Sequence, residues 1–291
     1  MREVRPDFAA RFACRAGRCA HSCCRGWEID VDAESAAYYR SLPGALGDEL
    51  RAALTEDSEG VHFRLDGEER CPFLRRDGLC RLICELGEEA LCDICALHPR
   101  FYTVCGDWEL AGLGLSCEAA AALLLETDGP LRFESEGETF TLPELLERLG
   151  APCGEEALRF APRQDAAYYA ALLAAYARTE PIDGRWEEEL AALRDGRDAA
   201  MTAVRDYAPR CDRGRYDRVL GYILYRQLDR LEERGLAALL AYARQSTAFI
   251  FLRDACLGDT AEQLRRWSEQ IEYSTENVDI LLETEEAGPV V

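Results

Sequence analysis

Residues 71–117 read CPFLRRDGLCRLICELGEEALCDICALHPRFYTVCGDWELAGLGLSC and hold seven of the fourteen cysteines of the chain. A second group of cysteines lies upstream with the spacing C-x4-C-x3-C-C, at Cys14, Cys19, Cys23 and Cys24. Eleven cysteines therefore fall in the first 117 residues of a 291-residue chain. A chain of this length can bury a sufficient core without crosslinks, so the clustering indicates metal binding or catalysis rather than stabilisation.

The sequence context favours reduced thiols. MREVRPDFAARFAC, at the start of the chain, has charges where a secretory signal would have an apolar region. No uninterrupted apolar run of about 18 residues occurs, and we expect no membrane span. A cytoplasmic location is the expectation, and cysteines clustered in that compartment are more often metal ligands or reactive thiols than disulfides.

The charge of the chain bears on its partners. The formal net charge is −21, and all 34 basic residues are arginine, so the sequence contains no lysine. Nucleic-acid binding needs a basic face, and we therefore expect no nucleic-acid partner. A lysine-modifying enzyme with this sequence has no lysine of its own to modify.

Thiolates are soft ligands that select zinc, copper(I) or iron–sulfur centres. Structural zinc sites usually pair two C-x2-C units, whereas this chain has one, Cys92 to Cys95, among longer and irregular spacings. The pattern favours an iron–sulfur centre over zinc and over free redox thiols, and it does not single out the ligands. Five further cysteines fit small buried apolar side chains: Cys84, Cys105, Cys153, Cys211 and Cys256.

Two residues that follow Cys95 in the sequence, His98 and Arg100, are candidates for a chemical role. His98 is a candidate ligand, proton carrier or structural hydrogen-bonding residue, and we favour the structural role. Arg100 offers a planar fork for a carboxylate or phosphate and is the candidate cofactor-binding residue, with a local ion pair as the alternative.

Short apolar runs broken by glycine and proline predict short elements through the cysteine-rich part. Asp32 precedes a helical pattern and predicts an N-cap, and Gly112 and Gly114 predict a tight turn. The elements expected there are an extended lead-in over 1–13, a helix over 33–41, a strand over 102–110, a helix over 117–126 and a hairpin over 131–142.

The remainder of the chain reads as helical, and apolar residues at i, i+3 and i+4 mark a buried stripe over 213–234. The helices expected there are 143–149, 164–179, 184–208, 213–234, 236–257, 259–272 and 275–284. We predict a mainly α protein of the α+β class, in which a cysteine-rich metal-cluster N-terminal half with a few short strands packs on a helical C-terminal half. The expected divisions are 1–127 as an iron–sulfur domain, 128–154 as hairpin and linker, and 155–291 as a helical domain.

Six segments together resemble one family, the flagellin lysine-N-methylases, within a wider group of cysteine-cluster proteins taken to chelate iron or zinc. The segments are FACRAGRCAHSCCRGWEIDVD (12–32), CPFLRRDGLC (71–80), GEEALCDICALHPRF (87–101), GLGLSCEAA (112–120), YDRVLGYILYRQLDRL (216–231) and WSEQIEYSTENVDILLE (267–283). The resemblance covers most of the chain and is weak over 128–210.

The resemblance implies an activity and its cofactors. The family implies methyl transfer from S-adenosylmethionine to lysine side chains of a partner protein with exposed lysines, for which flagellin is the candidate. It also implies that a four-iron (4Fe-4S) cluster is required. Cys84, Cys92 and Cys105 look like additions to the family pattern. Matched position by position, the family cysteines that would bind metal are Cys14, Cys19, Cys23, Cys24, Cys71, Cys80, Cys95 and Cys117.

Proton removal from the lysine amine needs a base or desolvation. Asp30, Asp32, Glu272 and Tyr273 are catalytic candidates because they lie in segments that resemble the family, with surface or capping roles as the alternative. Two other function classes stay open: a non-enzymatic zinc- or iron-binding structural protein, and an iron–sulfur redox protein.

Overall fold

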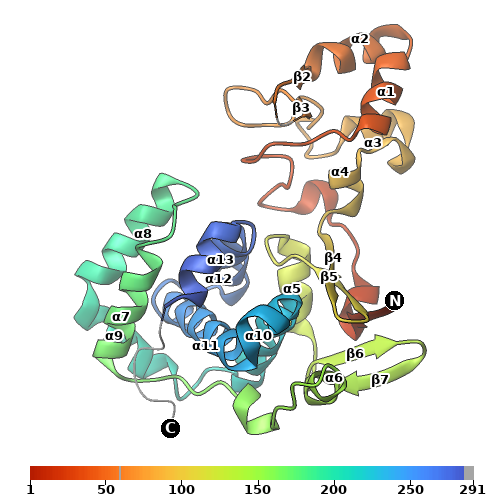
Figure 1. Ribbon diagram of the computed structural model, residues 1–291. Coiled ribbons are helices and arrows are strands. Elements are labelled where there is room, and N and C mark those ends of the chain that lie inside the picture. The colour runs from red at the N-terminus through yellow and green to blue at the C-terminus, as the bar shows by residue number, and fades with distance from the viewer. Residues whose placement is uncertain (59, 285–291) are drawn as a thin grey trace. The chain divides into compact units, whose positions relative to one another are not determined.

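The computed structural model describes residues 1–58 and 60–284. The chain forms two compact units, which are described separately (Figure 1). Unit 1 consists of Met1–Phe12 and Phe101–Val291, and unit 2 consists of Ala13–Arg100. Unit 2 is thus inserted in the sequence of unit 1, and the divisions expected at 127 and 154 both fall inside unit 1. The expected class, mainly α with some β structure, is confirmed.

Unit 2 is built from short elements around a small core. Asp32 caps the first α-helix, as predicted, because its carboxylate accepts a hydrogen bond from the Ser35 backbone N–H at 2.8 Å. The core of unit 2 is aromatic: Phe63 is stacked on Tyr39 and meets Phe73 edge-on. The elements in chain order are the 3-10 helix Ala16–Arg18, α1 Ala33–Ser41, α2 Gly44–Ala53, β2 Leu54–Glu56, β3 Val61–Phe63, α3 Arg81–Leu86, the 3-10 helix Glu88–Ala90 and α4 Asp93–Leu97.

Unit 1 contains a five-stranded mixed sheet with the strand order β4-β5-β1-β6-β7. The first strand of the chain is therefore the central one, parallel to β5 and antiparallel to β6. The extended lead-in expected over 1–13 is a strand of this sheet over Arg2–Pro6 and a 3-10 helix over Asp7–Arg11, which corrects the prediction. The strands are β1 Arg2–Pro6, β4 Arg100–Cys105, β5 Trp108–Leu113, β6 Arg132–Ser135 and β7 Glu138–Thr141.

Two predictions near β5 are wrong. The single strand expected over 102–110 is two strands, because Gly106 turns the chain with φ of 56°. Gly112 lies inside β5 rather than in a turn. A Cβ at Gly112 would lie 2.5 Å from the Phe101 ring and 2.8 Å from the Tyr222 hydroxyl, so the glycine is needed for close packing. The hairpin predicted over 131–142 is confirmed, with Gly137 in its turn.

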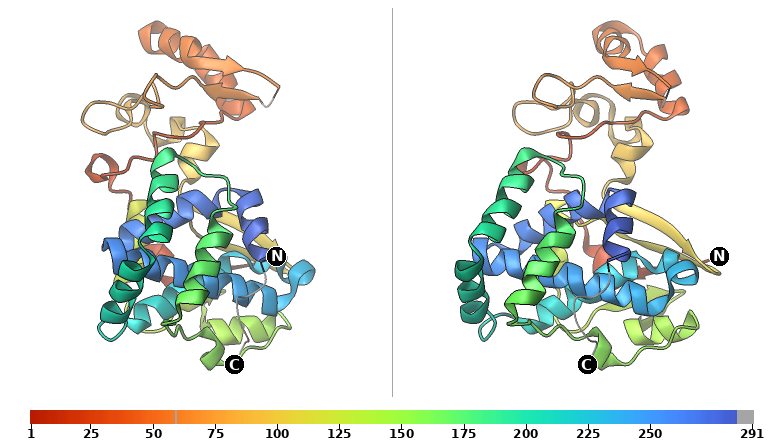
Figure 2. Two further views of the ribbon diagram at one scale, coloured as in Figure 1. Left: turned by 90° about the vertical axis from the view of Figure 1, so that its left-hand side faces the viewer. Right: turned by 60° about the vertical axis from the view of Figure 1, so that its left-hand side comes forward.

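The helices of unit 1 surround the long helix α11, and α7, α8 and α9 lie side by side (Figure 1, Figure 2). The helix predicted over 184–208 is broken at Gly196, and the one over 259–272 ends in a turn of π-helix. Besides 3-10 helices at Asp7–Arg11, Glu155–Leu158 and Leu228–Arg230, the helices are α5 Glu118–Glu126, α6 Leu142–Arg148, α7 Ala166–Tyr176, α8 Gly184–Asp195, α9 Arg197–Tyr207, α10 Arg213–Arg226, α11 Leu231–Leu257, α12 Thr260–Trp267, the π-helix Ser268–Glu272 and α13 Thr275–Leu282.

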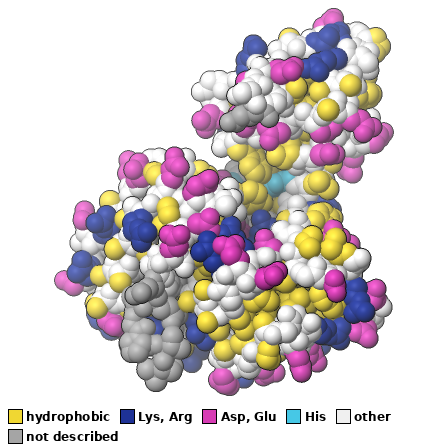
Figure 3. All heavy atoms as spheres, viewed as in Figure 1, with side chains coloured by type: hydrophobic (Ala, Val, Ile, Leu, Met, Phe, Trp, Pro, Cys, Tyr) yellow, Lys and Arg dark blue, Asp and Glu magenta, His cyan; other side chains and the backbone are white. Residues whose placement is uncertain are grey.

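One segment, Leu228–Leu257, is long and apolar enough by composition to cross a membrane. Of its most apolar 18-residue window, 67% is buried inside unit 1, as in the core helix of a globular fold. On the face shown in Figure 3, acidic and basic side chains are interspersed.

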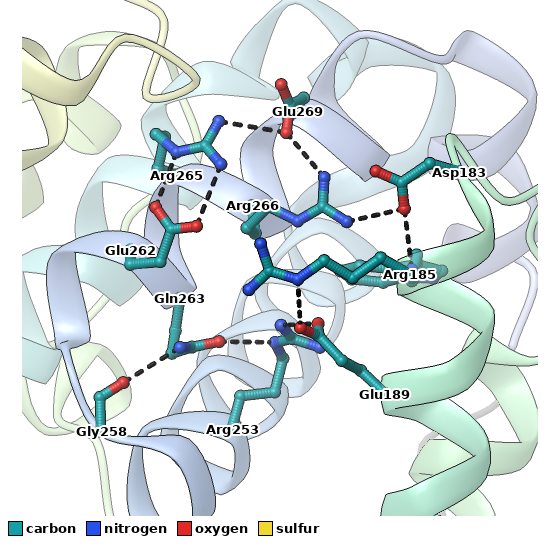
Figure 4. Close-up of polar contacts among 11 residues, drawn as sticks. Asp183, Arg185, Glu189, Arg253, Gly258, Glu262, Gln263, Arg265, Arg266 and Glu269 are labelled. Atoms are coloured by element: carbon teal, nitrogen blue, oxygen red, sulfur yellow. Dashed lines mark hydrogen bonds and ion pairs between the residues drawn. The ribbon is translucent and has the colours of Figure 1, made fainter. Parts of the chain in front are cut away.

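Buried charges hold α8, α11 and α12 of unit 1 together (Figure 4). Arg253 of α11 donates to Glu189 of α8 at 2.6 Å and to Gln263 of α12 at 2.9 Å. Arg266 of α12 donates to Asp183, the N-cap of α8, at 2.8 Å. Arg253 thus joins α11 to both α8 and α12, Arg266 joins α12 to α8, and each arginine side chain is at most 5% exposed.

Candidate functional site

Among the cysteines of unit 2 that affect one another's ionisation, Cys23 and Cys84 are exposed and five are buried or half-buried: Cys24, Cys71, Cys80, Cys92 and Cys95. We call these five the thiol group. Local backbone structure brings them together. The Cys71 backbone N–H donates to the Cys24 carbonyl at 2.9 Å, and the Cys95 N–H donates to the Cys92 carbonyl at 3.0 Å. Cys80 and Cys92 are the N-caps of α3 and α4.

Hydrogen bonds between thiols separate their pKa values. A bond from Cys95 lowers the pKa of Cys92, and the same bond raises the pKa of Cys95, so this pair shares one proton. A bond from Cys23 lowers the pKa of Cys24 to about 7, whereas burial raises the pKa of Cys71 to about 12. The thiol group therefore favours thiolate at Cys24 and Cys92 and keeps protons on Cys71, Cys80 and Cys95, whose pKa values are raised.

The thiol group matches an iron–sulfur centre in donor chemistry. Its sulfurs are soft ligands set in an apolar core, in which Cys71 and Cys92 are buried. Over residues 1–58 and 60–284, no set of three or more His, Cys, Asp or Glu side chains is arranged to hold a metal ion. The residues thus fit such a centre by type, while their side chains are not in a ligating arrangement.

The eight cysteines predicted as ligands are only partly together. Four of them, Cys24, Cys71, Cys80 and Cys95, belong to the thiol group, and Cys23 adjoins it. Cys14 is exposed, and its sulfur accepts from the Ala16 backbone N–H at 3.3 Å. Cys19 is half-buried in unit 2. Cys117 is in unit 1, as the N-cap of α5.

The sequence reasoning treated Cys92 as an addition, yet it lies inside the thiol group. Its C-x2-C spacing with Cys95 was the signal for it. Cys84 was expected to be buried and is exposed, which corrects that prediction, whereas Cys105 is buried as expected. Cys153, Cys211 and Cys256 are half-buried.

His98 follows the thiol group in sequence and is held by packing. Its ring meets Trp27 edge-on, with ring centroids 5.2 Å apart, and the Trp27 indole N–H donates to the Cys23 carbonyl at 2.6 Å. Burial lowers the pKa of His98 to about 4, so the ring is neutral. Its Nε2 is buried and has no hydrogen-bond partner within the described residues. A neutral ring with an unused nitrogen adds a possible donor to unit 2. Arg100 is exposed.

The four catalytic candidates are divided between the units, with Asp30 and Asp32 in unit 2 and Glu272 and Tyr273 in unit 1. Asp32 accepts from the backbone N–H groups of Ser35 and Asp93, which lower its pKa and make it a weak base. Its position is that of a structural cap. Asp30 is exposed and bridges to His62 through the backbone. Tyr273 belongs to unit 1 and is 43% exposed.

A second polar group lies in unit 1, at the C-terminal end of α10. The Glu272 side chain is 1% exposed and lies 3.9 Å from Arg226. Burial raises the pKa of Glu272, and the Ser268 hydroxyl donates to its other oxygen. The Arg226 guanidinium lies over the Phe101 ring at 3.8 Å. The sequence named Glu272 and Tyr273 but not Arg226, whose only signal was its place in a segment that resembles the family.

Comparison with known proteins finds distant relatives. The chain is 26% identical over 157 residues to the flagellar biosynthetic protein FliU of Salmonella muenchen, a match that covers 51% of this chain and 92% of that protein. It is 27% identical over 134 residues to a lysine-N-methylase of Salmonella typhimurium (strain LT2) and 26% identical over 134 residues to one of Salmonella choleraesuis (strain SC-B67).

The two lysine-N-methylase matches each cover 43% of this chain and 33% of the relative, so the chain spans about a third of their length. No protein-family model matches the chain, and no solved structure matches it. The resemblance predicted from the cysteine motifs is confirmed: the chain is a distant relative of the Salmonella lysine-N-methylases.

Proposed function

We propose that the protein is a cytoplasmic protein lysine N-methyltransferase that uses S-adenosylmethionine and acts on an exposed lysine-bearing segment of a partner protein, with flagellin as the candidate substrate. The observation that carries the proposal is the similarity to two proteins named lysine-N-methylase. The flagellar name of a third relative supports flagellin as the first substrate to test.

The reaction requires a neutral lysine amine aligned with the sulfonium methyl group. A nitrogen–carbon bond forms as the carbon–sulfur bond breaks, the bonding pair stays on sulfur, and S-adenosylhomocysteine leaves. The amine loses a proton to a base or to water. Desolvation lowers the pKa of a lysine amine, and alignment of two bound reactants supplies much of the acceleration.

We also propose that the thiol group holds a 4Fe-4S cluster. Cys24, Cys71, Cys80, Cys92 and Cys95 supply more than the four thiolates that such a cluster takes. A bound cluster would supply a redox-active iron centre whose properties depend on its thiolates and on burial. The protein's own contribution is an apolar surround for these sulfurs and two positions, Cys24 and Cys92, that favour thiolate.

The composition favours basic, lysine-rich substrate segments. The net charge of −21 attracts such segments over a distance that shortens as salt rises. Because the chain has no lysine, any methyl-lysine formed in an assay must lie on the partner.

The test begins with protein purified without oxygen. We expect a brown protein with about four irons and four sulfides per chain. Incubation with flagellin and methyl-labelled S-adenosylmethionine should give methyl-lysine, detected by mass spectrometry of flagellin peptides. A lysine-to-arginine variant of the modified peptide is the matched control.

The possible outcomes separate the parts of the proposal. Metal-loaded protein that labels no lysine on flagellin or on a lysine-rich peptide library would contradict the methyltransferase proposal. A colourless protein with about one zinc per chain would instead support a structural metal site.

A further inference from the structure

Three segments of unit 1 that lie far apart in sequence meet at one buried polar group. They are the residues after β5, the C-terminal end of α10 and the π-helix Ser268–Glu272. The Leu115 backbone N–H and the Arg226 guanidinium both act on the Glu272 carboxylate, and the Tyr273 hydroxyl lies close to Ser116. We call Ser116, Arg226 and Glu272 the α10 polar group.

Each member of the α10 polar group has a buried polar atom without a hydrogen-bond partner among the described residues. These atoms are Ser116 Oγ, Arg226 Nη1 and Glu272 Oε1. Buried polar atoms in folded proteins are almost always paired, and each exception calls for an explanation. Ser116 Oγ has only the nearby Tyr273 hydroxyl, the Glu272 carboxylate has the Leu115 backbone and Arg226 at 3.9 Å, and Arg226 Nη1 is unpaired. Hydrogen-bonding capacity therefore remains at this place, on three different segments, for a ligand.

The surroundings hold these atoms in place. Arg226 rests on the Phe101 ring at 3.8 Å, and that ring packs against Gly112, where no Cβ fits. The Tyr222 hydroxyl accepts from the Leu113 N–H at 2.7 Å and donates to the Leu113 carbonyl at 2.8 Å, which ties β5 to α10. A rigid support of this kind is what a binding site needs for its polar groups.

The backbone conformation at Glu272 also supports a binding site here. Helix α12 changes to a π-helix over Ser268–Glu272. Single π-turns are rare in helices and occur frequently at functional sites, because the wider turn redirects side chains. Here the wider turn ends at the residue whose carboxylate belongs to the α10 polar group.

The charges of the group define the ligand chemistry. A guanidinium donor and a carboxylate acceptor, 3.9 Å apart, complement a ligand end that carries both a carboxylate and an ammonium. A simple anion would use only Arg226, and a simple cation would use only Glu272. An α-amino-acid end carries both charges on adjacent atoms.

We propose that the α10 polar group binds the α-amino-acid end of S-adenosylmethionine, with Arg226 donating to its carboxylate and with Glu272 and Ser116 accepting from its ammonium. The identity of the ligand rests on the proposed function, whereas the amino-acid chemistry rests on the group itself. The partial exposure of Arg226, 14% of its side chain, leaves an edge of the group open to solvent.

Four ligands test the proposal by equilibrium binding to the full chain. S-adenosylmethionine and S-adenosylhomocysteine carry the amino-acid end, 5′-methylthioadenosine lacks it, and methionine carries it without the nucleoside. We expect Arg226→Gln to weaken S-adenosylhomocysteine binding at least about tenfold while 5′-methylthioadenosine changes less than about twofold. Arg230→Gln, which removes an arginine paired with Asp279, is the matched control and should change neither.

Ser116→Ala removes a single oxygen atom and guards against misfolding of the Arg226 variant. We expect it to weaken S-adenosylhomocysteine binding about three- to tenfold, again with no change for 5′-methylthioadenosine. Circular dichroism and thermal unfolding confirm that each variant is folded.

Several results would overturn the inference. One is unchanged S-adenosylhomocysteine binding in both variants, and another is an equal loss for the two nucleosides. If the normal protein binds methionine through Arg226 but binds neither nucleoside, the amino-acid site stands and the choice of methyl donor fails. If it binds S-adenosylmethionine independently of Arg226 and Ser116, the proposed function stands and this site fails.

Discussion

Replacing Arg253 by methionine should destabilise unit 1 strongly. Arg253 is 1% exposed, donates to Glu189 at 2.6 Å and lies over the Trp186 ring at 4.9 Å (Figure 4). Methionine fills similar space but leaves the Glu189 carboxylate, 17% exposed, without its buried partner. Removing one partner of a buried ion pair costs about 3–5 kcal/mol, since the remaining charge is still desolvated. We expect a loss in that range.

The chain supplies a matched control on the same carboxylate. Arg185 also pairs with Glu189, at 2.8 Å, but its side chain is 59% exposed. Exposed pairs contribute about 0–1 kcal/mol, so Arg185→Met should cost no more than that. Glu189→Gln should destabilise the Arg253→Met variant less than it destabilises the normal chain. In the Arg253→Met variant the Glu189 carboxylate has lost its buried partner, and the change to glutamine removes that uncompensated charge.

Urea unfolding followed by tryptophan fluorescence and by hydrogen exchange of α11 amides would measure these changes. Hydrogen exchange assigns the loss to unit 1, which matters because a chain with two units need not unfold in one step. The reasoning is refuted if Arg253→Met costs less than about 1 kcal/mol, or if it costs no more than Arg185→Met.

Three further predictions concern the thiol group, its neighbour and β5. Cys92→Ser should lower iron from about four to below about two per chain, whereas the exposed Cys84→Ser should not; equal iron in both would exclude Cys92 as a ligand. Burial lowers the pKa of His98 in the folded protein to about 4, against an ordinary value of 6.5. Between these pH values the unfolded chain binds a proton at His98 that the folded chain does not bind. The free energy of unfolding of unit 2 should therefore fall by about 3 kcal/mol as the pH falls from 7 to 4. His98→Gln should flatten that part of a thermal-unfolding pH profile, and an unchanged slope would contradict the assignment. Gly112→Ala should lower the free energy of unfolding in urea by about 1–3 kcal/mol through overpacking, and it should weaken S-adenosylhomocysteine binding. Gly221→Ala, where a Cβ would approach only side-chain atoms at 3.3 Å or more, should lower the free energy of unfolding less. A larger loss of stability in Gly221→Ala than in Gly112→Ala would contradict the packing argument.

Local signals in the sequence predicted local structure well. The N-cap at Asp32 and the Gly137 hairpin both follow from side-chain and glycine preferences within a few residues. Strand β1 was missed as a central strand because its partners, β5 and β6, lie more than 100 residues further along the chain. No short-range pattern records such pairing. Gly112 misled for a related reason, since its role depends on contact with Phe101 and Tyr222.

The two candidate sites also have a part that the local sequence predicts and a part that depends on the fold. The C-x2-C pair and the upstream cysteines marked the thiol group, although the sequence did not show that Cys92 belongs with Cys24. Arg226 and Ser116 come from segments separated by more than 100 residues, and each is an ordinary residue within its own segment. Only the fold places their unpaired atoms near Glu272.

The central position of β1 has a consequence for how the protein is made. Residues 2–6 are synthesised before the strands on either side of them, Trp108–Leu113 and Arg132–Ser135, which follow more than 100 residues later. At about 5–20 residues per second, that delay is roughly 5–20 s. The whole of unit 2 is synthesised within this delay and can fold before the strands that flank β1 have been made. Deleting residues 2–6 would therefore remove the central strand of the sheet in unit 1.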